Sequence, residues 1–189
     1  AMTVGLAFAV GMSLITGILI AYAEIPSLFA TLAMATFVYG FGRAHLITGT
    51  DVVYLPANIG WIAQLGQGHV LGIPMPIVVT AALALIVFLF LRYTKPGRFI
   101  YAMGDNFFTA RTGGVPVRPI LVAQYVMAGG IAFIAGIVTS TSAQAMNTRV
   151  VNSNMIYDVI LVVVLGGVGL SGGRGNVRNV IVGTLLIGV

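Results

Sequence analysis

The sequence predicts an all-α protein, a polytopic bundle of about six membrane-spanning helices, and three observations support this fold class. Only 7% of the 189 residues are charged and 59% are hydrophobic, whereas soluble domains carry roughly 25% charged residues. Long stretches lack any Asp, Glu, Lys or Arg. These stretches are continuously apolar instead of alternating with polar residues, which disfavours an outer-membrane β-barrel.

The charge-free stretches place the helices, because a bilayer core about 30 Å thick requires around 20 apolar residues in helical form. We expect helices, in chain order, over residues 2–22, 27–48, 74–92, 119–141, 156–170 and 178–189. The chain begins and ends inside apolar segments, so we expect a fragment of a single transmembrane domain (1–189) that continues at both ends.

The first two helices are separated by the turn Glu24-Ile25-Pro26. Small residues recur every fourth position along 2–22, a spacing that lets helix backbones approach closely in membranes. They are Gly5, Ala9, Ser13, Gly17 and Ala21. We therefore expect the first helix to pack tightly against a neighbour.

The third helix leads into the connection 93–118, where Pro96-Gly97 predicts a break. Asp105 or Asn106 can cap a new short helix at about 106–112, because their side-chain oxygens accept the free N–H groups of its first turn. Gly113-Gly114 predicts its end.

Phe107 and Phe108 are the large apolar side chains of this short helix. Two interpretations stay open on physical grounds. The pair either fits a groove on a partner protein or lies among lipid headgroups as an interfacial anchor.

The helix over 119–141 carries a second small-residue stripe, again predicting close packing. It consists of Ala128, Ala132, Gly136 and Ser140. The next charge-free stretch, 159–173, would extend only about 22 Å as a helix. The helix over 156–170 must therefore tilt or break near Gly166-Gly167.

Irregular backbone at membrane depth is tolerated only when it is packed in protein or lines a water-filled cavity. Close packing of the glycine-rich segment is one interpretation. The other is a pathway-lining role for Gly166, Gly167, Val168, Gly169 and Ser171.

Basic residues predict the orientation through the positive-inside rule. If the helices alternate, seven basic residues lie on one side, and Arg43 and Arg149 belong to the other. The seven are Arg92, Lys95, Arg98, Arg111, Arg118, Arg174 and Arg178. We therefore expect a multi-pass membrane protein, with 93–118 cytoplasmic and with 49–73 and 142–157 outside.

Several classes of site are not expected. The chain has no Cys, and its two His are far apart in sequence. It contains neither a nucleophile with a base and an orienting group nor a phosphate-binding Gly-rich motif with Lys. We expect no catalytic residue, no metal and no cofactor. The positive charge indicates contact with anionic lipids, and nucleic acid is not an expected partner.

Two motifs resemble the ribose-type (monosaccharide) ABC importer permease family. The first consists of Gly97 through Asn106, then Ala110-Arg111 and Gly114-Val115. The second consists of Ser142-Ala143-Gln144, Asp158, Val163 through Gly167 and Leu170 through Gly175. The resemblance covers essentially the whole chain. It implies a permease of about ten helices in a bacterial inner (plasma) membrane, of which this chain holds about six.

The resemblance gives the short helix a role, since in ABC importers a helix between two membrane segments docks on the ATPase subunit. It implies coupling positions at Asp105, Asn106, Phe107, Phe108, Ala110, Arg111 and Gly114. The implied partners are an ABC ATPase subunit, a periplasmic or extracellular substrate-binding protein and a second permease copy. The implied cargo is a monosaccharide, moved with ATP hydrolysed on the partner.

Two other classes remain alternatives. A secondary carrier or channel would transport without an ATPase, and a structural membrane anchor would not transport at all. The interpretation that we favour is the membrane-spanning subunit of an ATP-driven importer, with no enzymatic activity of its own.

Overall fold

A computed structural model describes residues 2–45, 52–54, 60–70, 72–147, 155–168 and 175–187. The chain divides into two compact units. Unit 1 comprises Ala1–Leu83 with Leu121–Val151, and unit 2 comprises Ala84–Ile120 with Asn152–Val189. Two long helices, α4 (Met75–Tyr93) and α7 (Val117–Ala143), contribute residues to both units.

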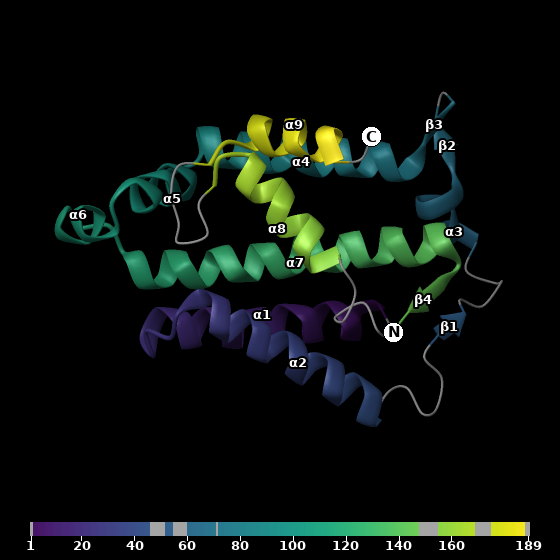
Figure 1. Cartoon of the computed structure of the whole chain (residues 1–189), viewed down its shortest axis with the longest axis horizontal. Helices are drawn as coiled ribbons and strands as arrows, with labels where there is room; N and C mark the ends of the chain where they lie inside the picture. The colour runs from purple at the N-terminus through teal and green to yellow at the C-terminus, as the bar shows by residue number, and fades with distance from the viewer. Residues whose placement is uncertain are drawn as a thin grey trace. The chain divides into compact units, whose positions relative to one another are not determined.

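In unit 1, α1 (Met2–Tyr22) packs along α7 through the small residues predicted for this purpose (Figure 1). A Cβ atom at Gly17 would lie only 3.0 Å from the Cα of Val122, and one at Gly5 would lie 3.1 Å from the Phe133 ring. The expectation of close packing for the first helix is confirmed. α2 (Ser27–His45) follows α1 and contacts it through the stacked rings of Phe8 and Phe41.

The small-residue stripe predicted on α7 is not the face that contacts α1. Ala128 and Ala132 are exposed, and a Cβ at Gly136 would meet no atom of the described residues within 4 Å. The contacting face is formed by Val122, Tyr125, Gly129 and Phe133. Small residues at every fourth position form a helix face without bulky side chains. The spacing does not say which helix packs on that face, because this depends on how the whole bundle is arranged.

Short elements that the sequence analysis did not predict join the two segments expected outside the membrane. β1 (Val52–Tyr54) pairs antiparallel with β4 (Ala145–Asn147). Between them in sequence lie α3 (Gly60–Gln67), β2 (His69–Val70) and β3 (Ile73–Pro74), the two strands forming a second small ladder.

α3 is held against the end of α7. The Ser142 hydroxyl donates a hydrogen bond to the Gly66 carbonyl over 3.1 Å, and a side chain at Gly66 would overlap the backbone of Thr141 and Ser142. The connections before α4 and after α7 are thus tied together within unit 1.

Unit 2 contains α5 (Lys95–Asp105), α6 (Phe107–Thr112), α8 (Met155–Leu165) and α9 (Val177–Ile187). α8 and α9 pack closely at two glycines. A Cβ at Gly183 would lie 2.9 Å from the Val162 carbonyl oxygen, and one at Gly166 would lie 3.3 Å from the Cα of Val180. Glycine is required here by the close approach of two helix backbones.

All six predicted apolar segments form helices in the described residues, most of them within three residues of the expected bounds. Residues 46–48 of the second predicted helix lie outside the described part. The largest difference is α8, which ends at Leu165 instead of continuing to 170. Of the two alternatives left open, tilt or a break near Gly166-Gly167, the structure shows the break.

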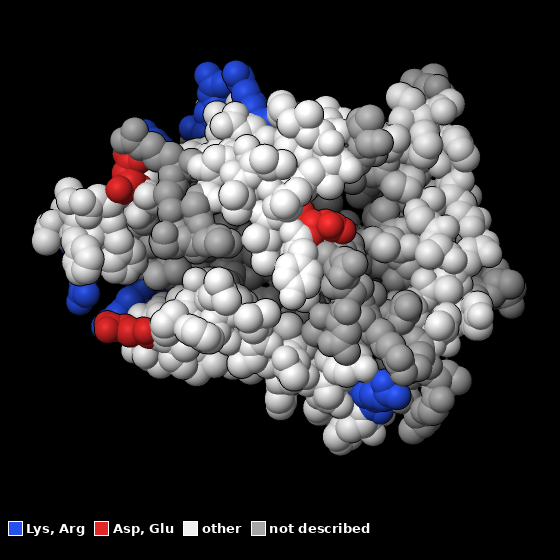
Figure 2. Space-filling view, viewed as in Figure 1, with Lys and Arg blue, Asp and Glu red and all other residues white. Residues whose placement is uncertain are grey.

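Three helices of the described residues are long and apolar enough to cross a membrane, namely α1, α4 and α7. Large apolar side chains are exposed on the surface of α4, where Leu85 and Ile86 are 57% and 61% exposed. Figure 2 shows that few acidic or basic side chains interrupt the visible surface. An outer surface of this kind matches a hydrocarbon solvent.

Candidate functional site: the segment between α4 and α7

The connection 93–118 is mostly helical, which corrects the expectation of a loop containing one short helix. α4 ends at Tyr93, and α5 begins at Lys95 with Pro96 in its first turn. Proline is well suited to this position because its missing N–H would have no helical partner there. The Pro96-Gly97 pair therefore starts a helix where we expected only a break.

Thr94 makes the junction between α4 and α5. Its hydroxyl donates to the Phe90 carbonyl over 2.7 Å and accepts a hydrogen bond from the Gly97 N–H over 3.2 Å. Gly97 is buried, and a side chain there would overlap the backbone of Phe90 and Leu91. α5 can leave α4 at this tight corner only because position 97 has no Cβ.

Asn106 terminates α5 and caps α6. Its backbone is extended (φ −157°, ψ 106°), and its N–H donates to the Ala102 carbonyl. Its side-chain oxygen accepts a hydrogen bond from the Thr109 N–H over 3.0 Å. The predicted cap and the predicted start of the short helix are both confirmed.

The C-terminal end of α6 is closed by glycine, again as predicted. Gly114 has a φ of +82°, its N–H donates to the Arg111 carbonyl, and the Val115 N–H donates to the Ala110 carbonyl. This pair of bonds is the Schellman arrangement, which satisfies carbonyls that the helix leaves without partners. α6 is thus fixed at both ends despite its six residues.

The side chains of α6 divide into an exposed and a buried set. Phe107 is 40% exposed and Phe108 77% exposed, with their rings edge-to-face and 6.1 Å apart. Arg111 is also exposed. Ala110 is only 7% exposed, so its side chain is buried.

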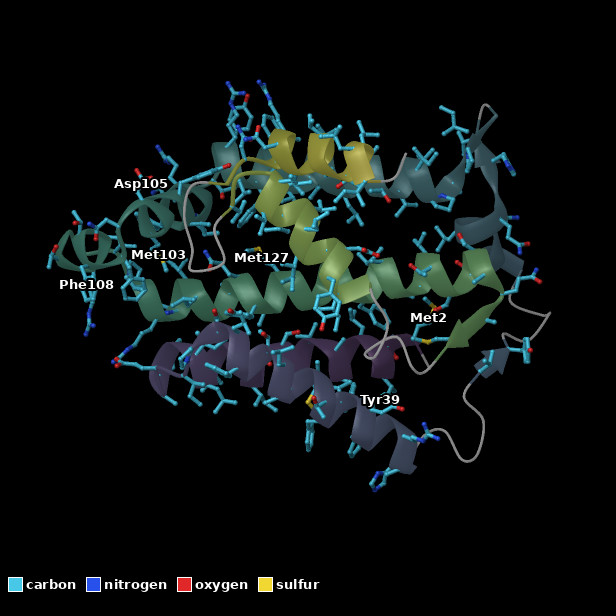
Figure 3. The ribbon with its side chains drawn as sticks, viewed as in Figure 1. Met2, Tyr39, Met103, Asp105, Phe108 and Met127 are labelled. Carbon is cyan, nitrogen blue, oxygen red and sulfur yellow. The ribbon has the colours of Figure 1, made fainter. Side chains whose placement is uncertain are left out.

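Four apolar residues in and just after the segment are buried. Met103, Val117 and Ile120 are each at most 9% exposed, like Ala110. Asp105 lies at the exposed end of α5, and Figure 3 shows Asp105 and Met103 on different sides of that helix. Except for Ala110, the residues with predicted coupling roles are therefore exposed.

The residues with a predicted pathway role follow the C-terminal end of α8, which, like that of α6, is terminated by glycine. Gly166 is buried against α9, Gly167 is exposed with a φ of +81°, and Val168 is half-buried. The close contact with α9 explains why a glycine is needed at position 166. Gly169 and Ser171 lie outside the described residues.

Within the described residues there is no group of three or more His, Cys, Asp or Glu side chains that could hold a metal ion. The features missed by sequence reasoning are α5 and its cap Thr94. The signal was present in the sequence, since Thr followed two residues later by Pro is typical of a helix start.

The family profile described as "Branched-chain amino acid transport system / permease component" matches residues 1–189. The chain therefore belongs to this family of transport permeases. With its long apolar helices, it is a multi-pass inner-membrane protein.

Individual relatives carry the names of sugar permeases. The chain is 33% identical over 175 residues to the ribose import permease RbsC of Haemophilus influenzae, covering 92% of this chain and 54% of the relative. It is 36% identical over 172 residues to the galactofuranose transporter permease YtfT of Escherichia coli, covering 90% and 49%.

A third relative is the L-arabinose transport system permease AraH of Escherichia coli, 35% identical over 179 residues, with coverage of 92% and 52%. The chain thus spans about half the length of these relatives. No solved structure matches it.

Proposed function

We propose that the chain is part of the membrane-spanning subunit of an ATP-driven ABC importer. The observation that carries this proposal is the family match over residues 1–189 to transport permeases. The partners follow from that class: an ABC ATPase subunit, a soluble substrate-binding protein outside the membrane and a second permease copy. The subunit has no enzymatic activity, and ATP is hydrolysed on the partner.

The proposed cargo is a monosaccharide. Relatives with more than 30% identity are named for ribose, galactofuranose and L-arabinose. These three sugars share a small polyhydroxyl ring, so the class of cargo is better supported than any one sugar.

We assign coupling to the ATPase to α6, which lies in sequence between the membrane helices α4 and α7. Phe108, 77% exposed, presents the largest apolar contact surface of α6, with Phe107 beside it. Burying such a ring in a partner groove contributes about 1.5–3 kcal/mol. Arg111 supplies a charged contact, while Ala110 supports the helix from inside.

The fixed ends of α6 make it suitable for transmitting motion. Asn106 and Gly114 hold the helix by side-chain and backbone hydrogen bonds, and the short connection 113–116 joins it to the start of α7. A displacement of α6 by a closing ATPase therefore reaches a membrane helix without first unwinding the segment. This arrangement, with 93–118 cytoplasmic, supports the coupling role.

A pathway-lining role for the glycine-rich segment is a separate part of the proposal. Among the described residues, Gly167 and Val168 are the candidates for this role, since Gly166 is buried against α9.

The test is the subunit composition of the full-length permease, tagged and extracted gently from its membrane. A nucleotide-hydrolysing subunit should co-purify with the native protein. Arg111→Glu and Gly114→Pro should both lose it, because the first reverses an exposed charge and the second cannot adopt a φ of +82°. Arg98→Glu, an exposed residue on α5, is the matched control and should retain it.

Retention of the ATPase by both α6 variants would contradict the docking assignment. Absence of any ATPase in several detergents, combined with uptake driven by an ion gradient, would instead indicate a secondary carrier.

A further inference from the structure

Two arginine side chains of unit 2 meet at one aromatic ring. The guanidinium carbon of Arg92, on α4, lies 5.7 Å from the centroid of the Phe88 ring. That of Arg178, on α9, lies 5.8 Å from the same centroid. Arg92 is also 5.7 Å from the ring centroid of Tyr93. Figure 2 shows basic side chains gathered over α4 and α9.

The cluster is positive and lacks a carboxylate. Each guanidinium is attracted by the electron-rich face of Phe88, but the two like charges repel each other. Within the described residues, no acidic side chain pairs with Arg92 or Arg178. An anion bound to both groups would remove the repulsion, and the planar guanidinium fork matches the oxygens of a phosphate.

The position of the cluster indicates where the anion comes from. Arg92 is the second-last residue of α4, a helix long enough to cross the membrane, so its guanidinium lies at the polar end of that span. Tyr93 beside it is 69% exposed, and Tyr is typical of the headgroup level of a bilayer. Phosphate groups are abundant at that level as lipid headgroups.

An exposed apolar track runs from each arginine along its helix. On α4, Leu89 and Leu85 lie three and seven positions before Arg92 and are 44% and 57% exposed. On α9, Ile181 and Leu185 lie three and seven positions after Arg178 and are 45% and 65% exposed. These spacings place each pair on the same helix face as its arginine. A lipid phosphate held by the arginines would therefore have its acyl chains on apolar surface.

We propose that Arg92 and Arg178, positioned by Phe88, form a binding site for the phosphate headgroup of an anionic phospholipid. A headgroup held by both arginines would add a bridge between α9 and the end of α4 to the contact that Arg178 already makes with Phe88. It is independent of the coupling role of α6, since none of its residues belongs to α5 or α6.

The test measures how much phosphatidylglycerol the purified full-length permease retains relative to phosphatidylcholine, after equilibration in vesicles of equal parts of both. The native protein should prefer phosphatidylglycerol. Arg92→Gln and Arg178→Gln should each reduce the preference about fivefold and the double variant about twenty-five-fold. Phe88→Leu should also reduce it, because the ring no longer holds the two groups together. Thermal unfolding and membrane yield of each variant establish that it is folded.

Arg98→Gln is the matched control, as it removes an exposed charge nearby on α5 and should leave the preference unchanged. An unchanged preference in the folded double variant would overturn the site. So would an equal loss in Arg98→Gln, since the effect would then reflect net charge alone. Displacement of phosphatidylglycerol by millimolar inorganic phosphate would overturn the lipid as the source of the anion.

Discussion

The C-terminal ends of α6 and α8 have the same backbone arrangement in different surroundings. At α6, Gly114 has a φ of +82° and bonds to Arg111, and the next residue bonds to Ala110. At α8, Gly167 has a φ of +81° and bonds to Val164, and the next residue bonds to Val163. Both helices end in a Schellman motif.

The surroundings differ in what a side chain would meet. A Cβ at Gly114 would have no atom of the described residues within 4 Å. A Cβ at the equivalent Gly167 would meet only the Asn179 side-chain nitrogen at 4.0 Å. The difference lies one residue earlier: a Cβ at Gly166 would lie 3.3 Å from the Cα of Val180 on α9, whereas one at Gly113 would meet only carbonyl oxygens of α6 itself. The end of each helix is therefore set locally by two glycines, while the role of that helix end depends on what packs against it. At α6 the stop frees a helix for a partner, and at α8 it fits one helix against another.

The largest expected effect breaks the packing on the α8 side. Gly183→Leu places a side chain at a position 2.9 Å from the Val162 carbonyl oxygen and should destabilise the protein by about 1–3 kcal/mol. Thermal unfolding of the full-length permease in detergent measures this. Gly136→Leu is the control, because its Cβ meets no described atom within 4 Å. Equal losses from both changes would contradict the packing account.

The next effect tests whether the two stops are equivalent. Gly114→Ala and Gly167→Ala each force an L residue into the left-handed region and should each cost roughly 1–2 kcal/mol in unfolding free energy. Similar losses would support a purely local stop. Gly130→Ala, in the middle of α7 with open space around it, should raise the unfolding free energy by up to about 1 kcal/mol, because Ala has the higher helix propensity.

A smaller effect is expected at the other end of α6. Asn106→Ala removes the acceptor for the Thr109 N–H and should cost about 1 kcal/mol, whereas Asn106→Asp keeps an acceptor and should cost little. Hydrogen exchange of the amides at 107–109 measures fraying of this turn. Equal protection in the Ala and Asp variants would show that the cap contributes nothing.

The smallest effect on stability is expected from Val168→Cys, which tests whether the residue after the end of α8 is accessible to water. The chain has no cysteine, so the new thiol is its sole one. If Val168 lines a water-filled pathway, a water-soluble thiol reagent should modify it in the native membrane. Thr16→Cys, at a position only 5% exposed, should stay unmodified. Equal protection of both thiols would remove the pathway hypothesis.

Sequence reasoning located the features that depend on local chemistry. Helix bounds follow from charge-free runs, the start of α6 from the Asn106 side chain, and both stops from paired glycines. Each of these depends on residues that are contiguous in sequence, so a single sequence carries enough information.

The features that it missed depend on partners distant in sequence or on competing local signals. The pairing of β1 with β4 joins residues on either side of two long helices. The face of α7 used by α1 is set by Gly129 and Phe133, whereas the periodic pattern pointed to Ala128 and Ala132. α5 was missed because Pro96-Gly97 signals a helix break and also suits a helix start, and the Thr94 cap decides between them.

The central claim is that α6 passes the motion of an ATPase to the membrane helices. Its most direct test is the number of monosaccharide molecules imported per ATP hydrolysed by the complete importer in proteoliposomes. Phe108→Ala, which removes a ring 77% exposed on α6, should weaken the ATPase contact by about tenfold or more and lower this ratio. Phe99→Ala removes a ring 37% exposed on α5 and should leave the ratio at the native value. A native ratio in Phe108→Ala, or the same fall in both variants, would contradict the account.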